Sequence, residues 1–156
     1  IRAGQVEDLG VGGEAMAVRL ALAHLIAGQP DRARPYLLEV ASANESAAAD
    51  PYSLADRAIA LELLGQSDAA VRAADAAVQA RPISRDALNG AQVAMTRAWV
   101  LIHSGIRADE GYAELEQLVG TIDQQPRWVA ATLPWMLLRD DERAQQIIRS
   151  KFPSAP

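Results

Sequence analysis

Two histidines and one run of acids are the side chains of this chain that could carry acid–base or metal chemistry. His24 and His103 are the only imidazoles, and neither has a carboxylate at the i, i+4 spacing that helical zinc proteases use. The chain has no cysteine, which excludes a thiolate zinc site and a cysteine nucleophile. We therefore expect no metal and no cofactor. His24 is expected to pack in the core rather than act as a base, and for His103 contact with a ligand is the alternative to packing.

Asp140, Asp141 and Glu142 could in principle provide a general acid and a general base. They stand where a helix is expected to begin, and carboxylates are favourable there because they complement the helix dipole. The glycine-rich stretch 10–13 lacks the following lysine and hydroxyl residue of a phosphate-binding loop. These residues indicate no enzyme. Catalysis would require a histidine within hydrogen-bond reach of an acid in a cleft.

Charge and hydropathy exclude two classes of partner. The 156 residues include 20 acidic and 15 basic side chains, a net charge of -5, so the chain lacks the basic surface that neutralises nucleic-acid phosphates. Its longest apolar stretch, 15–27, contains Arg19 and His24 and falls short of the roughly 20 residues of a membrane span. We expect a soluble chain in the cytoplasm. The periplasm is the alternative, because the absence of cysteine leaves the redox compartment open.

Three glycines end helix-like apolar runs and define a repeat. Gly28, Gly65 and Gly105 follow the runs LAHLIA, IALELL and WVLIHS. Their intervals of about 37 and about 40 residues are typical of stacked helical repeats. A glycine directly after a helix commonly ends it in a left-handed conformation. Each glycine is therefore predicted to lie at a turn between two helices.

Helix starts are predicted from residues whose side chains can cap free backbone amides. Asp50 precedes Pro51, and an N-cap acid followed by a first-turn proline is a favourable helix start. Pro134 should break or kink its element, because proline lacks an amide donor. The N-cap candidates are Asp50, Ser67, Ser84 and one of Asp140 and Asp141.

Arg57 and Arg97 recur at the same distance before a glycine. A buried guanidinium needs a hydrogen-bonded carboxylate, because an unpaired buried charge is strongly unfavourable. We expect the two aliphatic stems to pack while the charged heads reach solvent or a neighbouring acid. A functional anion site is the alternative.

Small residues also recur at fixed distances from the three glycines. Ala21, Ala58 and Ala98 each lie seven residues before their glycine, and Ala33 and Ala70 lie five after. This pattern resembles the tetratricopeptide repeat, which places small residues where the two helices of a pair cross. The resemblance implies an all-α fold in which antiparallel helix-turn-helix pairs stack as a short right-handed α-solenoid of about three repeats plus a C-terminal capping segment.

The same resemblance implies a domain organisation. Pro82 stands where this family commonly ends a repeat. The expected parts are a flexible leader at 1–13, three hairpin repeats in 14–122 at about 14–46, 50–82 and 84–122, capping helices at 123–152 and a loose tail at 153–156.

The C-terminal sequence carries a second resemblance. PRWVAATLPWMLLRDDERAQQIIRSKF is similar to the closing segment of repeat domains in multidomain bacterial regulators, such as winged-helix transcription regulators, cyclases and protein kinases. Together with a start at Ile1 instead of methionine, it predicts an excised regulatory or assembly domain of a larger bacterial protein.

The tetratricopeptide register implies which residues face inward. In that family the first helices line a concave surface, and here this surface would be mainly apolar, as suits an apolar peptide or helix. The implied partner-binding residues are Val18, Leu22, Leu25, Tyr52, Ala55, Ile59, Glu62, Gln92, Met95, Trp99, Ile102 and His103.

The expected function is a non-enzymatic module for protein–protein interaction or scaffolding, which binds an apolar peptide or helix of unknown identity, or a second copy of itself, on this face. Coverage of the face by the chain's own leader or capping helix is the competing interpretation. The alternative function is a small-molecule-sensing regulatory domain, in which the same concave pocket with His103 and Glu62 admits a ligand.

Overall fold

The computed structural model describes residues 16–42, 50–121 and 126–152, and all regular structure in these ranges is α-helical. The predicted all-α class is therefore confirmed for the described part. The leader at 1–13 and the tail at 153–156 lie outside it. The helices are α1 (Met16–Ile26), α2 (Pro30–Ser42), α3 (Pro51–Leu63), α4 (Ser67–Ala80), α5 (Ala87–Ser104), α6 (Ala108–Leu118), α7 (Pro126–Ala131), α8 (Leu133–Met136) and α9 (Glu142–Ser150).

Aspartates cap three of the helices. The Asp50 carboxylate accepts hydrogen bonds from the amides of the first turn of α3, and Asp141 accepts one from the Ala144 amide in α9. Both caps were predicted. The predictions for Ser84 and Ser67 were wrong, because α5 begins after Asp86, whose carboxylate accepts from the Asn89 amide, and Ser67 is already the first residue of α4.

Glycines reverse the chain between α1 and α2, between α3 and α4, and between α5 and α6. Gly28, Gly65 and Gly105 have φ angles of 71°, 77° and 72°, a left-handed conformation that strains residues with a side chain. An added Cβ would meet no atom within 4 Å at any of these glycines, so backbone conformation and not space selects glycine. The predicted inter-helix turns are confirmed at all three positions.

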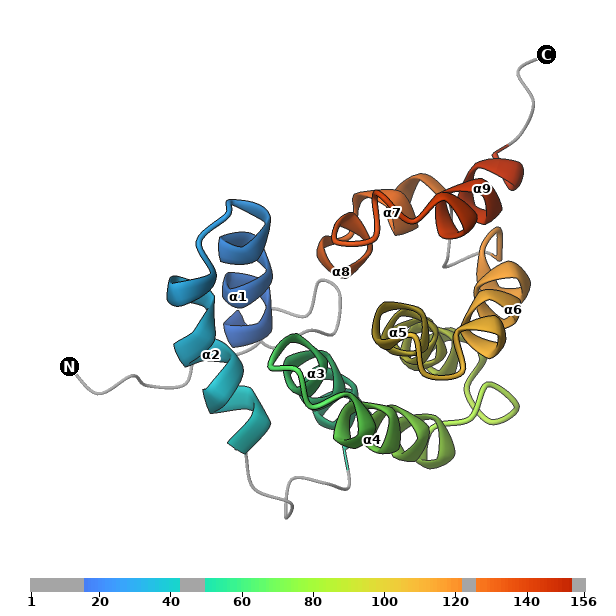
Figure 1. Ribbon diagram of the computed structural model, residues 1–156. Helices are drawn as coiled ribbons and strands as arrows, with labels where there is room; N and C mark the ends of the chain where they lie inside the picture. Colours follow the sequence, from blue (N-terminus) through green and yellow to red (C-terminus); the bar gives the residue numbers. More distant parts are fainter. Residues whose placement is uncertain (1–15, 43–49, 122–125, 153–156) are drawn as a thin grey trace.

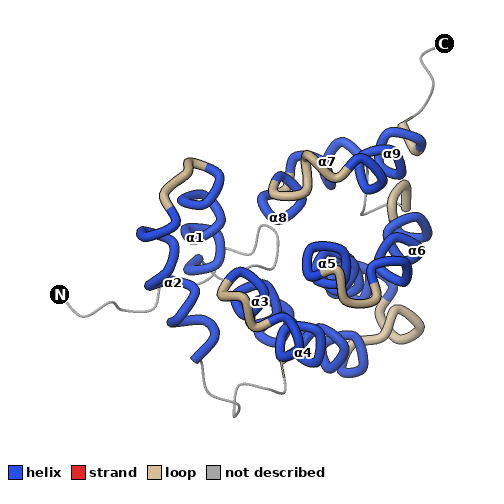
Figure 2. The backbone as a smooth tube through the Cα atoms, in the orientation of Figure 1, coloured by secondary structure: helices blue, strands red, loops and turns tan. Residues whose placement is uncertain are grey.

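Consecutive helices pack as pairs, α1 with α2, α3 with α4 and α5 with α6. The pairs are in contact through α2 and α3 and through α4 and α5, and α9 packs on α6. Figure 1 shows α5 near the centre of this arrangement, with the C-terminal helices on the side of α5 opposite α4. Figure 2 shows that turns join the helices of each pair and that the chain returns with α8 towards α1. The contact of α8 with α1 brings a segment near residue 135 against the first described helix.

The core lies within and between the pairs, with its largest side chains on α1, α3 and α5 and alanines at the crossings. Trp99, Leu22 and Ile59 are its largest fully buried side chains. The repeating alanines predicted to lie at crossings, Ala21, Ala58 and Ala98, are fully buried. Among the described residues, no helix has the length and apolar character that a membrane crossing needs.

Gly111 lets α5 and α6 approach closely. A Cβ on Gly111 would lie 2.9 Å from the Ala98 carbonyl oxygen and 2.9 Å from side-chain atoms of Leu101 and Ile102. Contacts this short force a shift in packing. The α5–α6 crossing therefore depends on a residue without a side chain.

Candidate binding site

Most of the residues that the repeat register places on one concave face are buried. Eight of the twelve have exposed fractions of 6% or less, and Trp99, Leu22 and Val18 have none. Leu25, Tyr52 and Gln92 are partly buried, and His103 is exposed. The eight buried residues are Val18, Leu22, Ala55, Ile59, Glu62, Met95, Trp99 and Ile102.

The structure brings together part of this set and separates the rest. Ala55 belongs to a second hydrophobic cluster with Leu54, Ala77 and Val93, and Tyr52 packs against that cluster. The hydroxyl of Tyr52 donates to the amide oxygen of Asn89. One main cluster contains the remaining apolar members of the predicted set, which are Val18, Leu22, Leu25, Ile59, Met95, Trp99 and Ile102.

The chain's own C-terminal segment lies against this main cluster. The Nε1 of Trp99 donates a hydrogen bond of 2.7 Å to the backbone oxygen of Pro134 in α8. Trp135 is 5% exposed and belongs to the same cluster as Trp99 and Leu22. The described chain therefore covers part of the predicted face with α8, and partner binding on that face stays a prediction.

Glu62 and His103 join α3 to α5 beside Trp99. The Nδ1 of His103 lies 2.8 Å from Oε1 of Glu62, and the imidazole stacks on the indole of Trp99 with ring centroids 4.7 Å apart. Glu62 is 6% exposed, and its Oε2 is buried without a hydrogen-bond partner. This contact meets the hydrogen-bond part of the condition for a catalytic histidine, which is an acid within reach of the imidazole.

His24 has a more ordinary environment. Its Nδ1 lies 3.0 Å from the amide oxygen of Gln29, and its ring is stacked at 6.0 Å on Tyr36 in α2. The side chain is only partly buried. His24 therefore ties the α1–α2 turn together at the surface of the core through an amide and an aromatic ring.

Arg97, one of the two repeat-equivalent arginines, is the centre of a charge network. Its guanidinium contacts the carboxylates of Asp75 at 2.6 Å and Glu114 at 2.7 Å, and also that of Glu110. Arg107 shares Asp75 and Glu110. The expected pairing of a buried arginine with neighbouring acids is confirmed for Arg97.

This network shifts the pKa values of its members in opposite directions. Hydrogen bonds from Arg107 and Arg97 lower the pKa of Glu110 to about 2. Burial opposes ionisation of Asp75, but hydrogen bonds from the same two arginines outweigh it and lower the pKa of that carboxyl. Burial raises the pKa of Glu114 despite its contact with Arg97.

Arg57 is bound differently from Arg97. Its Nε donates a hydrogen bond of 3.2 Å to the backbone oxygen of Ala41 near the end of α2. Carbonyl groups in the last turn of a helix have no partner within the helix, and a cation is favourable there. Arg57 therefore links α3 to the C-terminal end of α2.

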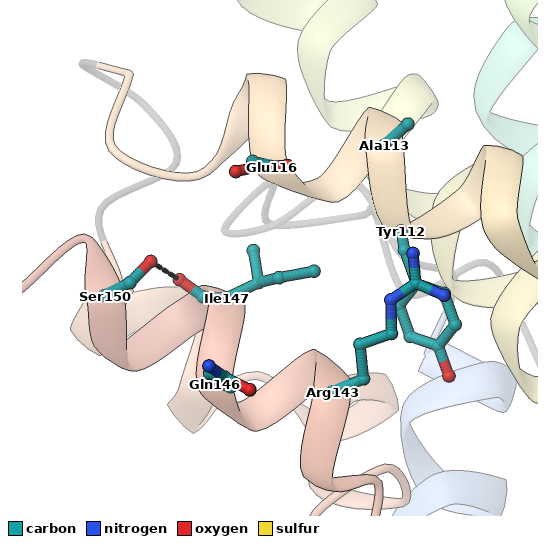
Figure 3. Close-up of a pocket in the computed structure, with 7 residues that line it drawn as sticks. All are labelled: Tyr112, Ala113, Glu116, Arg143, Gln146, Ile147 and Ser150. Carbon is teal, nitrogen blue, oxygen red and sulfur yellow. Dashed lines mark hydrogen bonds between the residues drawn. The ribbon is translucent and has the colours of Figure 1, made fainter.

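A groove of about 400 Å³ lies between α6 and α9. In Figure 3, Ile147 points into the space between the two helices, and the guanidinium of Arg143 lies over the ring of Tyr112. Burial and a hydrogen bond to Asp141 raise the pKa of Tyr112 to about 12. Sequence reasoning missed this groove because no local pattern pairs α6 with α9. Its lining residues are Tyr112, Ala113, Glu116, Arg143, Gln146, Ile147 and Ser150.

In the described ranges, no group of three histidine or acidic side chains is arranged to hold a metal ion. No protein-family model, curated protein or solved structure matches this chain. The two family resemblances therefore stay predictions from the sequence.

Proposed function

We propose that this chain is a tetratricopeptide-like interaction module whose hairpins form a short right-handed solenoid. Its inner face, the concave face that the repeat register implies, binds an apolar helical segment of a partner. The observation that carries the proposal is the position of α8. A short helix with apolar side chains lies against the inner face, and its backbone accepts a hydrogen bond from Trp99. The chain's own segment thus supplies an example of what this face accommodates.

The mode of binding follows from the chemistry of the face. Leu22, Ile59 and Trp99 offer apolar contact area, and the indole N–H of Trp99 offers one directional polar contact. Helix-in-groove recognition uses spaced apolar anchors of this kind. A partner segment would take the place of α8. A regulatory or assembly role in a larger bacterial protein rests on the sequence resemblance alone.

Competition between tethered and free segments tests the proposal. A fluorescent peptide of residues 126–139, which covers α7 and α8, would be added to the full chain carrying Trp135→Ala. Removing the buried Trp135 weakens the tethered segment. We expect saturable binding measured by fluorescence anisotropy, at least about tenfold tighter than to the unmodified chain, where the tethered segment competes.

Two controls make the competition specific. A peptide with Trp135→Ala should bind the same chain weakly, and a chain with Leu38→Ala, an exposed position on α2, should behave like the unmodified chain. If the peptide does not bind the weakened chain, or binds the Leu38→Ala chain equally well, the proposal fails.

A small-molecule-sensing domain is the second candidate function. The observation that favours it is the Glu62–His103 contact, in which a buried carboxylate on α3 meets a solvent-accessible imidazole on α5 beside Trp99. A ligand bound there would touch two different hairpins. Its binding could change how the hairpins stack.

A further inference from the structure

We propose that Glu62 and His103 form a binding point for a cationic N–H donor, a primary ammonium or a guanidinium group, which donates to Oε2 of Glu62. The group could belong to a free amine or to a lysine or arginine side chain of a bound segment. The inference rests on the proposed binding role of the inner face and adds the chemistry that this face recognises.

The starting observation is an unsatisfied oxygen. The side chain of Glu62 is 4% exposed, Oε1 contacts His103 at 2.8 Å, and Oε2 is buried without a hydrogen-bond partner. An ionised carboxylate accepts hydrogen bonds at both oxygens. A buried acceptor without a donor is unfavourable, and such groups are rare in native proteins. An incoming donor would therefore gain a contact that the closed chain does not provide.

The charge of the site selects a cation over a neutral donor. Hydrogen bonds between an N–H cation and a carboxylate are shorter and about twice as strong as neutral ones. Arg97 on α5 and Arg107 just before α6 are already bound to Asp75 and Glu110. A chain with a net charge of -5 also attracts cations to its surface.

Access to the site is through His103. Its side chain is 30% exposed, whereas that of Glu62 is 4% exposed, so the imidazole forms the solvent side of the contact. His103 lies in the last turn of α5, two residues before the left-handed Gly105.

Two histidines make the site directly observable. In the full chain labelled with ¹³C-histidine, His103 and His24 each give one Cε1–Hε1 signal, and a His24→Gln variant assigns them. The probes are n-butylammonium and n-butylguanidinium chloride at constant ionic strength. The control is tetramethylammonium chloride, which has the same charge but no N–H donor.

We expect the two donors to shift the His103 signal saturably, with little change at His24, and tetramethylammonium to have no saturable effect. Glu62→Gln keeps the shape of the side chain but removes its charge, and should weaken the binding about tenfold or more. His103→Gln should retain binding, measured by calorimetry, because Glu62 supplies the acceptor.

A second arm distinguishes the sources of the cation. Acetyl-Leu-Lys-Leu amide is compared with the same peptide containing trimethyllysine. Saturation by the free amines assigns a small-molecule source, and saturation by the lysine peptide alone assigns a side chain. The proposal is overturned if no donor saturates, if tetramethylammonium acts equally, or if Glu62→Gln binds as tightly. Failure of the competition between peptide 126–139 and α8 would leave this free-amine result unaffected.

Discussion

Trp99 and Arg97 lie two residues apart on α5 but take part in opposite kinds of interaction. Trp99 is fully buried in the main hydrophobic cluster and has one hydrogen bond, to Pro134. Arg97 faces α4 and α6 and contacts three carboxylates. Residues two positions apart on a helix point to nearly opposite sides, so one helix can present an apolar face to the core and a charged face to its neighbours.

The apolar face and the charged face of α5 respond differently to pH and salt. Apolar burial is non-directional and depends little on pH or salt. Ion pairs weaken as salt screens them and as acid protonates their carboxylates. The Trp99 side of α5 should therefore set the stability of the fold, while the Arg97 side should make the α4–α5–α6 contacts sensitive to solution conditions.

The largest expected effect is at Trp99. Trp99→Ala removes a fully buried indole and should lower the free energy of unfolding by about 3–5 kcal/mol. The measurement is urea denaturation monitored by circular dichroism. Leu38→Ala on the exposed face of α2 is the control and should change stability by less than about 0.5 kcal/mol. A loss at Trp99 as small as the control's would remove the basis of the comparison.

The next effect in size is at Arg97. Arg97→Met keeps an apolar stem but leaves Glu114, the least exposed acid of the network, without its partner. This substitution should lower the free energy of unfolding by about 2 kcal/mol. Arg107→Met should cost less, because the Arg107 side chain is 40% exposed. Denaturation at low and high salt should show a smaller loss at high salt. Equal losses at both salt concentrations would contradict an electrostatic origin.

Acid should weaken the charged face selectively. The folded chain lowers the pKa of Glu110 from 4.5 to about 2, so its carboxylate stabilises the fold above about pH 4.5 and loses this contribution as the pH falls toward about 2. Glu110→Gln should flatten this fall, whereas Trp99→Phe should not. The measurement is the urea midpoint of the unmodified chain and of each variant between about pH 5 and about pH 3. An unchanged slope in Glu110→Gln would refute this assignment.

The smallest expected effect is at an isolated surface ion pair. Arg139 lies 3.7 Å from Asp140, and the two side chains are 76% and 94% exposed. Arg139→Ala should change the free energy of unfolding by less than about 0.5 kcal/mol, because exposed pairs contribute little. A loss comparable to that of Arg97→Met would mean that burial does not distinguish the network from a single pair.

Much of the local structure follows from short sequence patterns. The turns at Gly28, Gly65 and Gly105 and the caps at Asp50 and Asp141 depend on backbone conformation and on side chains a few residues away. The cap of α5 was misplaced at Ser84. The helix begins after Asp86, whose carboxylate accepts a hydrogen bond from the Asn89 amide.

The sequence also predicted only part of the candidate site. The repeat register selected Trp99, Leu22 and Ile59 as one set, and they do share a cluster, because helical periodicity fixes which residues lie on a common face. The register placed Ala55 in that set as well, but packing of α3 against α4 and α5 put it in a separate cluster.

By itself, the sequence determined the three glycine turns and the caps at Asp50 and Asp141, since both depend on interactions within a few residues. Only the tertiary structure decided what the apolar sides of the helices contact. The bond from Trp99 to Pro134, the contact of Glu62 with His103 and the groove between α6 and α9 join segments far apart in the chain. Such contacts depend on how all the helices pack together, and no local pattern encodes them.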